Sequence, residues 1–343
     1  MTEARAFLAR VGYERERVAA VREEGGDSLL TALVALFIDG VVLGVAEATD
    51  VLGEGVELLT AAGLLTRTAE TVKRAVLLVP HEGLLIASDD PGYDGNDYVT
   101  GVQRPSHILA LLTPRRRVRS AADIGTGCGI QALLAARFAD RVVATDLNER
   151  ALEFCELNAG LNGVDTIETR PGSFLEPLGG EKFDLVVANP PYVVSPSTAF
   201  LFRDAGRGDA VSEELVRGIE PVLEPRGHAV VMISWVANDD EGVERPLTWI
   251  GGDSGAVLIV TDVKDAVADA KAWIDASGSA EPEAELERWH SWYREWGIEQ
   301  LAYGAVVLRR GGRGRRVLAV GDDARIPTSE NLLKLLDELE HAG

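Results

Sequence analysis

Residues 121–130 read Ala-Ala-Asp-Ile-Gly-Thr-Gly-Cys-Gly-Ile: a short apolar run passes into three glycines at alternate positions, and a helical pattern follows. Glycine lets the backbone turn tightly and lets a ligand approach closely, while the start of a helix offers N–H groups without helical partners. The dinucleotide fingerprint has the spacing Gly-x-Gly-x-x-Gly, whereas the spacing here is Gly-x-Gly-x-Gly. The stretch therefore predicts a strand, a ligand-binding loop and a helix, and leaves the ligand open.

Two further apolar runs end in polar residues. Residues 142–148 read Val-Val-Ala-Thr-Asp-Leu-Asn, and Asp146 lies 23 residues after the aspartate of the first stretch, where a carboxylate can bind a ribose diol. Residues 183–192 read Phe-Asp-Leu-Val-Val-Ala-Asn-Pro-Pro-Tyr. Asn189 offers a carboxamide oxygen, and because Pro190 has no N–H, the turn is rich in carbonyl groups. Such a turn suits a planar amino group, at the sheet edge where parallel strands deliver their loops.

Together the three motifs resemble the class I S-adenosylmethionine-dependent methyltransferases over residues 98–320. The Asn-Pro-Pro-Tyr motif resembles their amino-methylating branch, which includes HemK-like glutamine methyltransferases of peptide release factors and the adenine or guanine amino methyltransferases of RNA and DNA. The resemblance implies a Rossmann-like α/β sheet, an N-methylating enzyme and S-adenosylmethionine as cofactor. The implied catalytic residues are Asn189, Pro190, Pro191 and Tyr192. The implied cofactor-binding residues are Arg104, Asp123, Gly125, Thr126, Gly127, Gly129, Asp146, Leu147, Asn148, Gly172, Ser173, Phe174 and Asn189.

Two positions depart from the glutamine methyltransferases. Arg104 and Pro105 match a segment that lines the cofactor pocket in that family, but Ser106 takes the place of its next, acidic residue. Ser173 stands where most relatives carry Asp, so the adenine amino group would be bound more weakly or by the Ser hydroxyl and the backbone. The first departure weakens the assignment to glutamine.

The resemblance also implies a mechanism. An amide or exocyclic amine is a poor nucleophile because its lone pair is delocalised. Asn189 would accept one N–H and the Pro190 carbonyl the other, which turns the nitrogen toward the sulfonium methyl, while Tyr192 stacks on the planar group. Proximity and alignment can carry this transfer without a strong general base. A protein glutamine is the leading acceptor, a base of a structured RNA is the second, and a non-catalytic interaction protein with a vestigial pocket is the third.

Charge restricts the partners. The chain of 343 residues has a formal net charge of −21, so its overall field repels polyanions. Two arginine-rich runs, residues 115–119 and 309–316, are the candidates for a local patch that could hold RNA, although both fit solvated loops. The RNA interpretation is favoured if these runs converge beside Tyr192.

Cysteine usage and hydropathy give no sign of a metal site, a disulfide framework or a membrane segment. Cys128 and Cys155 are the two cysteines, and neither belongs to a Cys/His cluster with metal spacing. Cys128 is interpreted as a small residue in the cofactor loop rather than a nucleophile. Because no long apolar run or signal-peptide pattern is present, we expect a cytoplasmic protein.

Residues 1–90 predict a separate helical domain. Helices over 29–38, 45–52 and 56–65 and two strands over 75–79 and 84–87 give the order of a winged helix. No Lys or Arg occurs between Arg22 and Arg67, so phosphate contacts are missing and specific DNA binding is not expected. A structural, protein-docking or dimerising role is predicted instead, which leaves a homodimer open.

The rest of the chain continues the α/β pattern. Residues 193–209 are too long and polar for a tight connection and are interpreted as a substrate flap. A looser insertion is expected at 236–283, followed by a helix with an aromatic stripe interpreted as core. Residues 303–308 and 316–320 predict an antiparallel hairpin that closes the sheet, and 321–343 a C-terminal tail helix.

Overall fold

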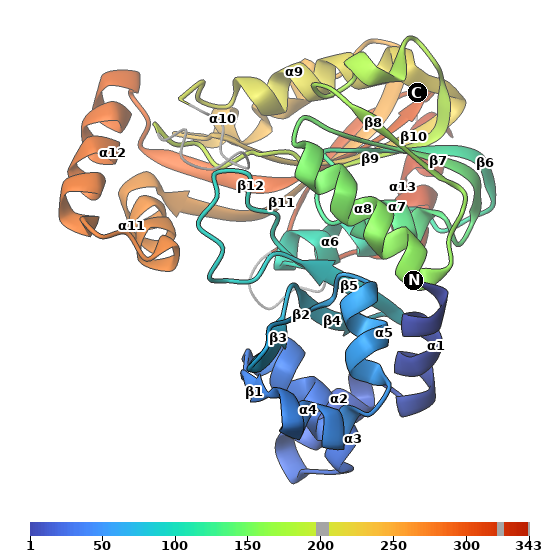
Figure 1. The fold of residues 1–343 in the computed structure, drawn as a ribbon. Coiled ribbons are helices and arrows are strands. Elements are labelled where there is room, and N and C mark those ends of the chain that lie inside the picture. Colours follow the sequence, from blue (N-terminus) through green and yellow to red (C-terminus); the bar gives the residue numbers. More distant parts are fainter. Residues whose placement is uncertain (197–205, 321–325, 342–343) are drawn as a thin grey trace.

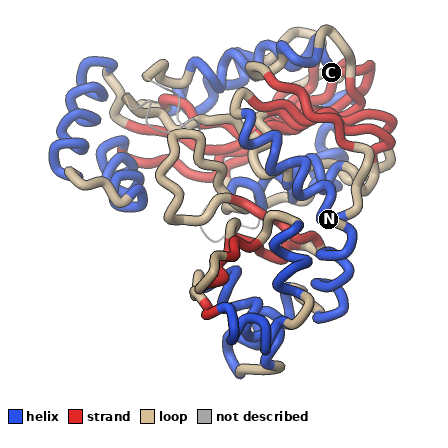
Figure 2. The backbone as a smooth tube through the Cα atoms, viewed as in Figure 1, coloured by secondary structure: helices blue, strands red, loops and turns tan. Residues whose placement is uncertain are grey.

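A computed structural model places the chain in an N-terminal domain and a larger domain built on a central sheet (Figure 1). The structure describes residues 1–196, 206–320 and 326–341. Figure 2 shows the strands of the large domain gathered in its centre, with helices on both sides and the smaller domain attached along one flank. Within the described residues, no helix has the length and apolar character needed to cross a membrane.

The central sheet has eight strands in the order β13-β11-β12-β10-β9-β6-β7-β8. Neighbours from β10 to β8 run parallel, whereas β12 is antiparallel to both β10 and β11. This confirms the predicted Rossmann-like α/β sheet. Its strands are β6 (Val118–Ile124), β7 (Ala139–Asp146), β8 (Ile167–Pro171), β9 (Phe183–Ala188), β10 (Leu223–Val236), β11 (Ser254–Asp265), β12 (Gln300–Arg310) and β13 (Arg315–Ala319).

Both faces of this sheet are buried, which explains why its strands read as continuous apolar runs. Successive residues point to opposite faces, so Ala121 packs in the core under α6, α7 and α13, while Ala122 packs in the core under α9. The helices of this domain are α6 (Arg104–Leu112), α7 (Ile130–Ala135), α8 (Glu149–Asn162), α9 (Ala210–Ile219), α10 (Asp240–Glu244), α11 (Ala266–Ser277), α12 (Pro282–Trp296) and α13 (Ser329–His341), with short turns η2 (Glu176–Leu178), η3 (Glu220–Val222) and η4 (Arg245–Trp249).

The C-terminal third corrects two predictions. The antiparallel hairpin of 303–308 and 316–320 is wrong, because β10 and β11 occupy both edges of β12 and β13 instead pairs in parallel with β11. Strand β11 falls within the segment 236–283 that was expected to be a looser insertion, yet it is an interior strand of the sheet. The helix predicted within 321–343 is present as α13, and its Leu332 and Leu336 pack into the core of the sheet domain.

The N-terminal domain contains α1 (Thr2–Val11), α2 (Arg15–Glu24), α3 (Ser28–Val34), the π-helical turn η1 (Ala35–Asp39), α4 (Val45–Leu52) and α5 (Gly55–Ala61). Its three-stranded sheet has the order β1-β3-β2, with β1 (Leu43–Gly44), β2 (Leu65–Arg67) and β3 (Thr71–Arg74). The hairpin predicted from residues 75–79 and 84–87 exists as β4 (Leu77–His81) and β5 (Leu84–Ser88), but it forms a separate two-stranded sheet. The winged-helix interpretation itself stays a prediction.

Candidate functional site

Three loops meet at the carboxyl edge of the sheet, because β6, β7 and β9 are adjacent parallel strands that end in register. Ile124 at the end of β6 pairs with Thr145 on β7 and with Ala188 on β9. The loops that follow these strands begin at Gly125, at Leu147 directly after Asp146, and at Asn189. The three sequence motifs are therefore neighbours in space, as the sequence predicts.

The three glycines of the first loop share a positive φ but differ in the space around them. Gly125, Gly127 and Gly129 have φ of +69°, +54° and +80°, which disfavours any other residue. A Cβ on Gly129 would lie 2.8 Å from the Sγ of Cys155, so this glycine allows α7 and α8 to pack closely. A Cβ on Gly127 would meet nothing within 4 Å, so its backbone faces open space at the edge of the sheet.

Asp123 lies beneath the loop and supports it. Its side chain is 1% exposed, and its Oδ2 accepts hydrogen bonds from the Thr126 hydroxyl at 2.7 Å and from the Ala132 N–H at 3.0 Å. Burial raises the pKa of this carboxyl to about 7. These contacts give Asp123 and Thr126 a role in holding the cofactor loop. Burial also raises the pKa of the Cys128 thiol to about 12, which fits its interpretation as a small loop residue.

Asp146 joins the second loop to the first. One of its carboxylate oxygens accepts the Gly127 N–H at 2.9 Å and the other accepts the Asn148 N–H at 2.9 Å. Each oxygen keeps a further lone pair, so the carboxylate can still accept from a ribose diol. Burial raises the pKa of Asp146, and the backbone N–H groups of Gly127, Asn148 and Leu147 oppose that rise. Leu147, beside it, is 66% exposed.

A further loop, residues 172–174, was also predicted to bind the cofactor, and it is hydrogen-bonded to the end of β7. The Gly172 N–H donates to the carbonyl of Asp146 at 3.0 Å, and the Thr145 hydroxyl donates to the carbonyl of Phe174 at 3.3 Å. Phe174 has a φ of +44°, an uncommon conformation for a non-glycine residue. Ser173 is thereby fixed between two backbone anchors. Arg104 is exposed at the first position of α6.

The Asn-Pro-Pro-Tyr motif lies directly against the glycine loop, since a Cβ on Gly125 would be 3.9 Å from the Asn189 carbonyl oxygen and from the Pro190 Cα. Among the residues that the structure describes, none bonds to the buried side-chain oxygen of Asn189. A buried acceptor without a partner costs about 1–3 kcal/mol, so a donor that reached this oxygen would be bound favourably. The binding of an amino group by Asn189 stays a prediction.

Tyr192 is half-buried beside Asn189, and its ring is fixed from behind. Its ring centroid lies 6.4 Å from that of Tyr303 on β12, with an angle of 69° between the planes. The Ser234 hydroxyl on β10 donates to the carbonyl of Tyr192. Burial raises the pKa of the Tyr192 phenol, so it remains neutral. Sequence reasoning missed Ser234 and Tyr303, because both lie within ordinary strand patterns without a motif.

The structure describes only part of the predicted substrate flap, 193–209. Residues 197–205, including Arg203 and Asp204, lie outside the described residues. The described ends are joined, since the Gly206 N–H donates to the carbonyl of Ser195 at 2.9 Å. In the described residues, no group of three or more His, Cys, Asp or Glu side chains could hold a metal ion.

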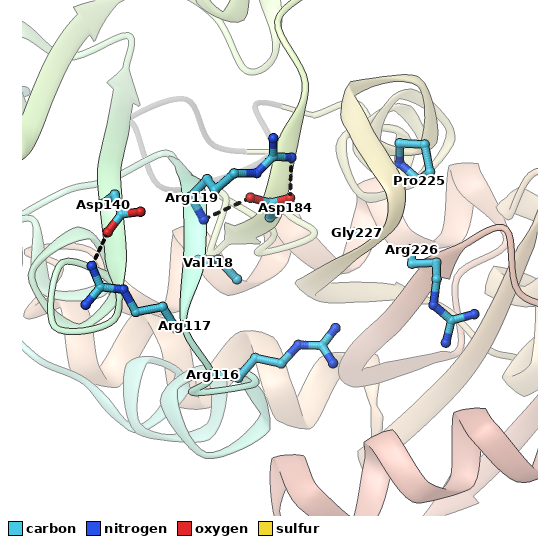
Figure 3. Close-up of a pocket in the computed structure, with 9 residues that line it drawn as sticks. All are labelled: Arg116, Arg117, Val118, Arg119, Asp140, Asp184, Pro225, Arg226 and Gly227. Atoms are coloured by element: carbon cyan, nitrogen blue, oxygen red, sulfur yellow. Dashed lines mark hydrogen bonds and ion pairs between the residues drawn. The ribbon is translucent and has the colours of Figure 1, made fainter.

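The arginine-rich runs do not converge beside Tyr192. Residues 116–119 lie at the start of β6, at the opposite edge of the sheet, and line a hollow of about 330 Å³ together with Arg226 (Figure 3). Arg117 pairs there with Asp140, and Arg119 pairs with Asp184. The second run is used within the fold: Arg309 is 3% exposed and pairs with acidic residues of α13.

Comparison with known proteins agrees with this geometry. Residues 100–246 match the methyltransferase small domain family. The chain is 34% identical over 132 residues to the release factor glutamine methyltransferase of Xylella fastidiosa strain 9a5c, which covers 34% of this chain and 47% of that protein. It is 31% identical over 157 residues to the ribosomal protein uL3 glutamine methyltransferase of Bradyrhizobium diazoefficiens, covering 41% and 49% respectively. The chain thus spans about half the length of these relatives.

A crystal structure of a methyltransferase from Pyrococcus furiosus aligns with a TM-score of 0.40 and 17% identity, over 67% of this chain and 90% of that one; a likeness this distant adds nothing to the argument. The matched segment carries the three loops on the sheet described above, and this part of the chain is similar to class I methyltransferase domains. The cofactor of this class is S-adenosylmethionine. The residues present fit it, because Asp146 keeps acceptor capacity, Gly127 faces open space and the Asn189 oxygen is unpartnered within the described residues.

Proposed function

We propose that this protein transfers a methyl group from S-adenosylmethionine to the side-chain amide nitrogen of a glutamine in a protein. The observation that carries the proposal is the buried, unpartnered oxygen of Asn189 next to the glycine loop. A primary amide has two N–H donors to place. The Asn189 side-chain oxygen accepts one and the Pro190 carbonyl accepts the other, so the nitrogen lone pair is turned toward the cofactor.

The protein's own contribution is alignment and exclusion of water. The bound cofactor supplies an electrophilic methyl group on a sulfonium. Tyr192, neutral and held by Tyr303 and Ser234, provides a flat surface for the amide. Formation of the N–C bond would break the S–C bond of the sulfonium and release a neutral thioether, and the methylated nitrogen would then lose one N–H proton to water. Because the positive charge of the sulfonium would be consumed, a dry pocket would favour the transfer without a strong general base.

Glutamine is preferred over an RNA base for two reasons. The relatives reported above are named as glutamine methyltransferases, one of a release factor and one of a ribosomal protein. The exposed arginine cluster lies at the sheet edge opposite the site, where RNA bound to it would be far from Tyr192. A protein acceptor in the cytoplasm, and a docking rather than a DNA-binding role for the N-terminal domain, complete the proposal.

The test is methyl transfer from labelled S-adenosylmethionine into a fractionated cell extract. We expect the label to be released by protease treatment, to resist ribonuclease, and to appear as methylglutamine after complete proteolysis. Label that is released by ribonuclease instead would assign the activity to RNA. The Asn189→Ala protein serves as the inactive control in both digestions.

A further inference from the structure

Helices α11 and α12 form a hairpin at the same sheet edge as the proposed methylation site. The hairpin begins after Asp265, the last residue of β11, which pairs with Gln300 at the start of β12. The next residue of β12, Leu301, pairs with Val236 at the end of β10. Because β10 runs parallel to β9, its end and the Asn189 loop lie on one edge. Figure 1 shows the hairpin, in orange, projecting from that end of the sheet.

The hairpin is attached to the chain segment that follows Tyr192. The Tyr293 hydroxyl on α12 donates to the carbonyl of Val194 at 2.9 Å. Val193 and Val194 share a small core with Ala270 and Trp289 of the hairpin. The position of the hairpin therefore fixes where the segment beyond the Asn-Pro-Pro-Tyr motif leaves the site.

A second attachment reaches Tyr192 itself. Asp269 on α11 is 3% exposed and accepts a 2.5 Å hydrogen bond from the hydroxyl of Tyr303, the residue whose ring packs edge-on against Tyr192. The Lys264 ammonium lies 3.6 Å from the same carboxylate and 5.3 Å from the centre of the Tyr303 ring. The order of contacts is thus Asp269, Tyr303, Tyr192, so the hairpin and the site form one continuous structure.

The last turn of α12, which leads back to the sheet, presents exposed aromatic surface. Trp296 is 52% exposed, and its ring lies against that of Trp292 with centroids 5.2 Å apart and an angle of 37° between the planes. The Trp296 ring also borders the loop after the motif, since a Cβ on Gly208 would lie 3.3 Å from it. Exposed indole rings favour contact with apolar and cationic groups of a partner.

The hairpin is also strongly acidic. Residues 262–299 contain ten acidic and four basic side chains, a net charge of −6 with histidine neutral. Glu295 and Glu299, which flank Trp296 in the sequence, are both exposed. Carboxylates around an aromatic surface attract a cationic polypeptide segment and repel an anionic one, and RNA is of the second kind.

We propose that the α11–α12 hairpin forms one side of the acceptor-binding site and binds a basic segment of the protein that is methylated. Trp292 and Trp296 contact the segment, the carboxylates select its charge, and the contacts through Tyr293 and Tyr303 place it relative to Tyr192. The identity of the segment as a methyl acceptor rests on the proposed function, whereas its binding does not.

The experiment measures binding and methyl transfer separately. Two labelled synthetic peptides share a central glutamine, with Arg and Lys flanks in one and Asp and Glu flanks in the other. Their affinities are measured by fluorescence anisotropy on the full chain with S-adenosylhomocysteine present. We expect the basic peptide to bind at least about tenfold more tightly, and added salt to weaken it. Equal binding of the two peptides overturns the proposal.

Variants locate the contact. We expect Trp296→Ala to weaken the basic peptide about five- to tenfold, Trp296→Phe to restore most of that loss, and the double change Glu295→Lys with Glu299→Lys to reduce the charge preference. The control is Val42→Ala, which removes an equally exposed apolar side chain from the N-terminal domain. Unchanged binding in folded Trp296→Ala protein removes α12 from the interface. A basic peptide that binds through Trp296 without being methylated refutes the proposed glutamine methylation and leaves the surface in place.

Discussion

Replacement of Asn189 by Ala separates chemistry from folding more sharply than any other change in this protein. The side-chain oxygen of Asn189 is buried and has no hydrogen-bond partner in the described part of the chain. Removing it therefore breaks no hydrogen bond of the free protein. We expect the free energy of unfolding to stay unchanged or to rise by up to about 1 kcal/mol, because an unsatisfied acceptor is lost.

Methyl transfer responds in the opposite direction. A pre-placed hydrogen-bonding group in a water-excluded site is worth about 10²–10³ in rate, or about 2.7–4 kcal/mol of barrier, by analogy with one oxyanion-hole donor. We expect the single-turnover rate of Asn189→Ala to fall by that factor. Its affinity for S-adenosylmethionine should stay within about threefold of wild type, which is less than about 1 kcal/mol.

Thermal melts, calorimetric titration of the cofactor and single-turnover transfer test the three expectations on the same preparation. The matched control is Asn162→Ala, because the Asn162 carboxamide is fully used by the backbone of Leu85, at 2.9 and 2.8 Å. That variant should lose stability and keep its rate. If Asn189 only shapes the strand-to-loop turn, its Ala variant will behave like the control, and near-wild-type turnover would falsify the amino-binding role.

Four other outcomes follow from the contacts. Asp146→Ala should weaken S-adenosylmethionine binding by about 1.5–3 kcal/mol, measured by titration of a folded variant; unchanged affinity would remove this carboxylate from the site. Gly129→Ala should lower stability by about 2–4 kcal/mol in denaturant melts, because its Cβ would lie 2.8 Å from the Cys155 Sγ at a φ of +80°; an unaltered midpoint would contradict the packing described. Burial raises the folded-state pKa of Asp123 from 3.8 to about 7, so the folded protein binds the extra proton and its stability should fall as pH rises through that window. Asp123→Asn should remove this part of the pH dependence, which melts of both proteins from acid to neutral pH can compare. The isolated unit of residues 28–88 should not bind a DNA duplex specifically, and a tight, salt-sensitive shift in a mobility assay would refute this.

The sequence predicts that the three loops lie together because each loop is a local feature. Each consists of an apolar run followed by residues whose backbone or side-chain chemistry is specific, and parallel strands place such loops on one edge whatever the strand order. The supports of the site are different. Tyr303 and Asp269 lie 34 positions apart and meet only because β11 and β12 pair, and no local pattern records that pairing. The misplaced C-terminal hairpin has the same cause.

The aromatic stripe of α12 shows where helical periodicity stops being informative. Trp289 and Tyr293 are each 1% exposed, which confirms the core interpretation for the middle of the helix. Trp296 lies seven residues after Trp289, on nearly the same face, yet it is 52% exposed. Periodicity gives the direction of a side chain but not the extent of what covers it, and the covering core ends before the last turn of α12.

The N-terminal domain also takes part in supporting the cofactor loop, through Asn158. This residue of α8 is fully buried, and its carboxamide exchanges hydrogen bonds of 2.7 and 2.8 Å with the backbone of Ala87 on β5. The same amide nitrogen donates to the carbonyl of Cys128 in the glycine loop at 2.8 Å. Nearby, Arg150 pairs with the buried carboxylate of Asp89, directly after β5. One side chain thus joins the hairpin of the first domain to the loop that the cofactor requires, so loss of that hairpin would leave a buried amide and a loop carbonyl without support. The N-terminal domain therefore has a structural role next to the glycine loop, independent of any partner that it binds.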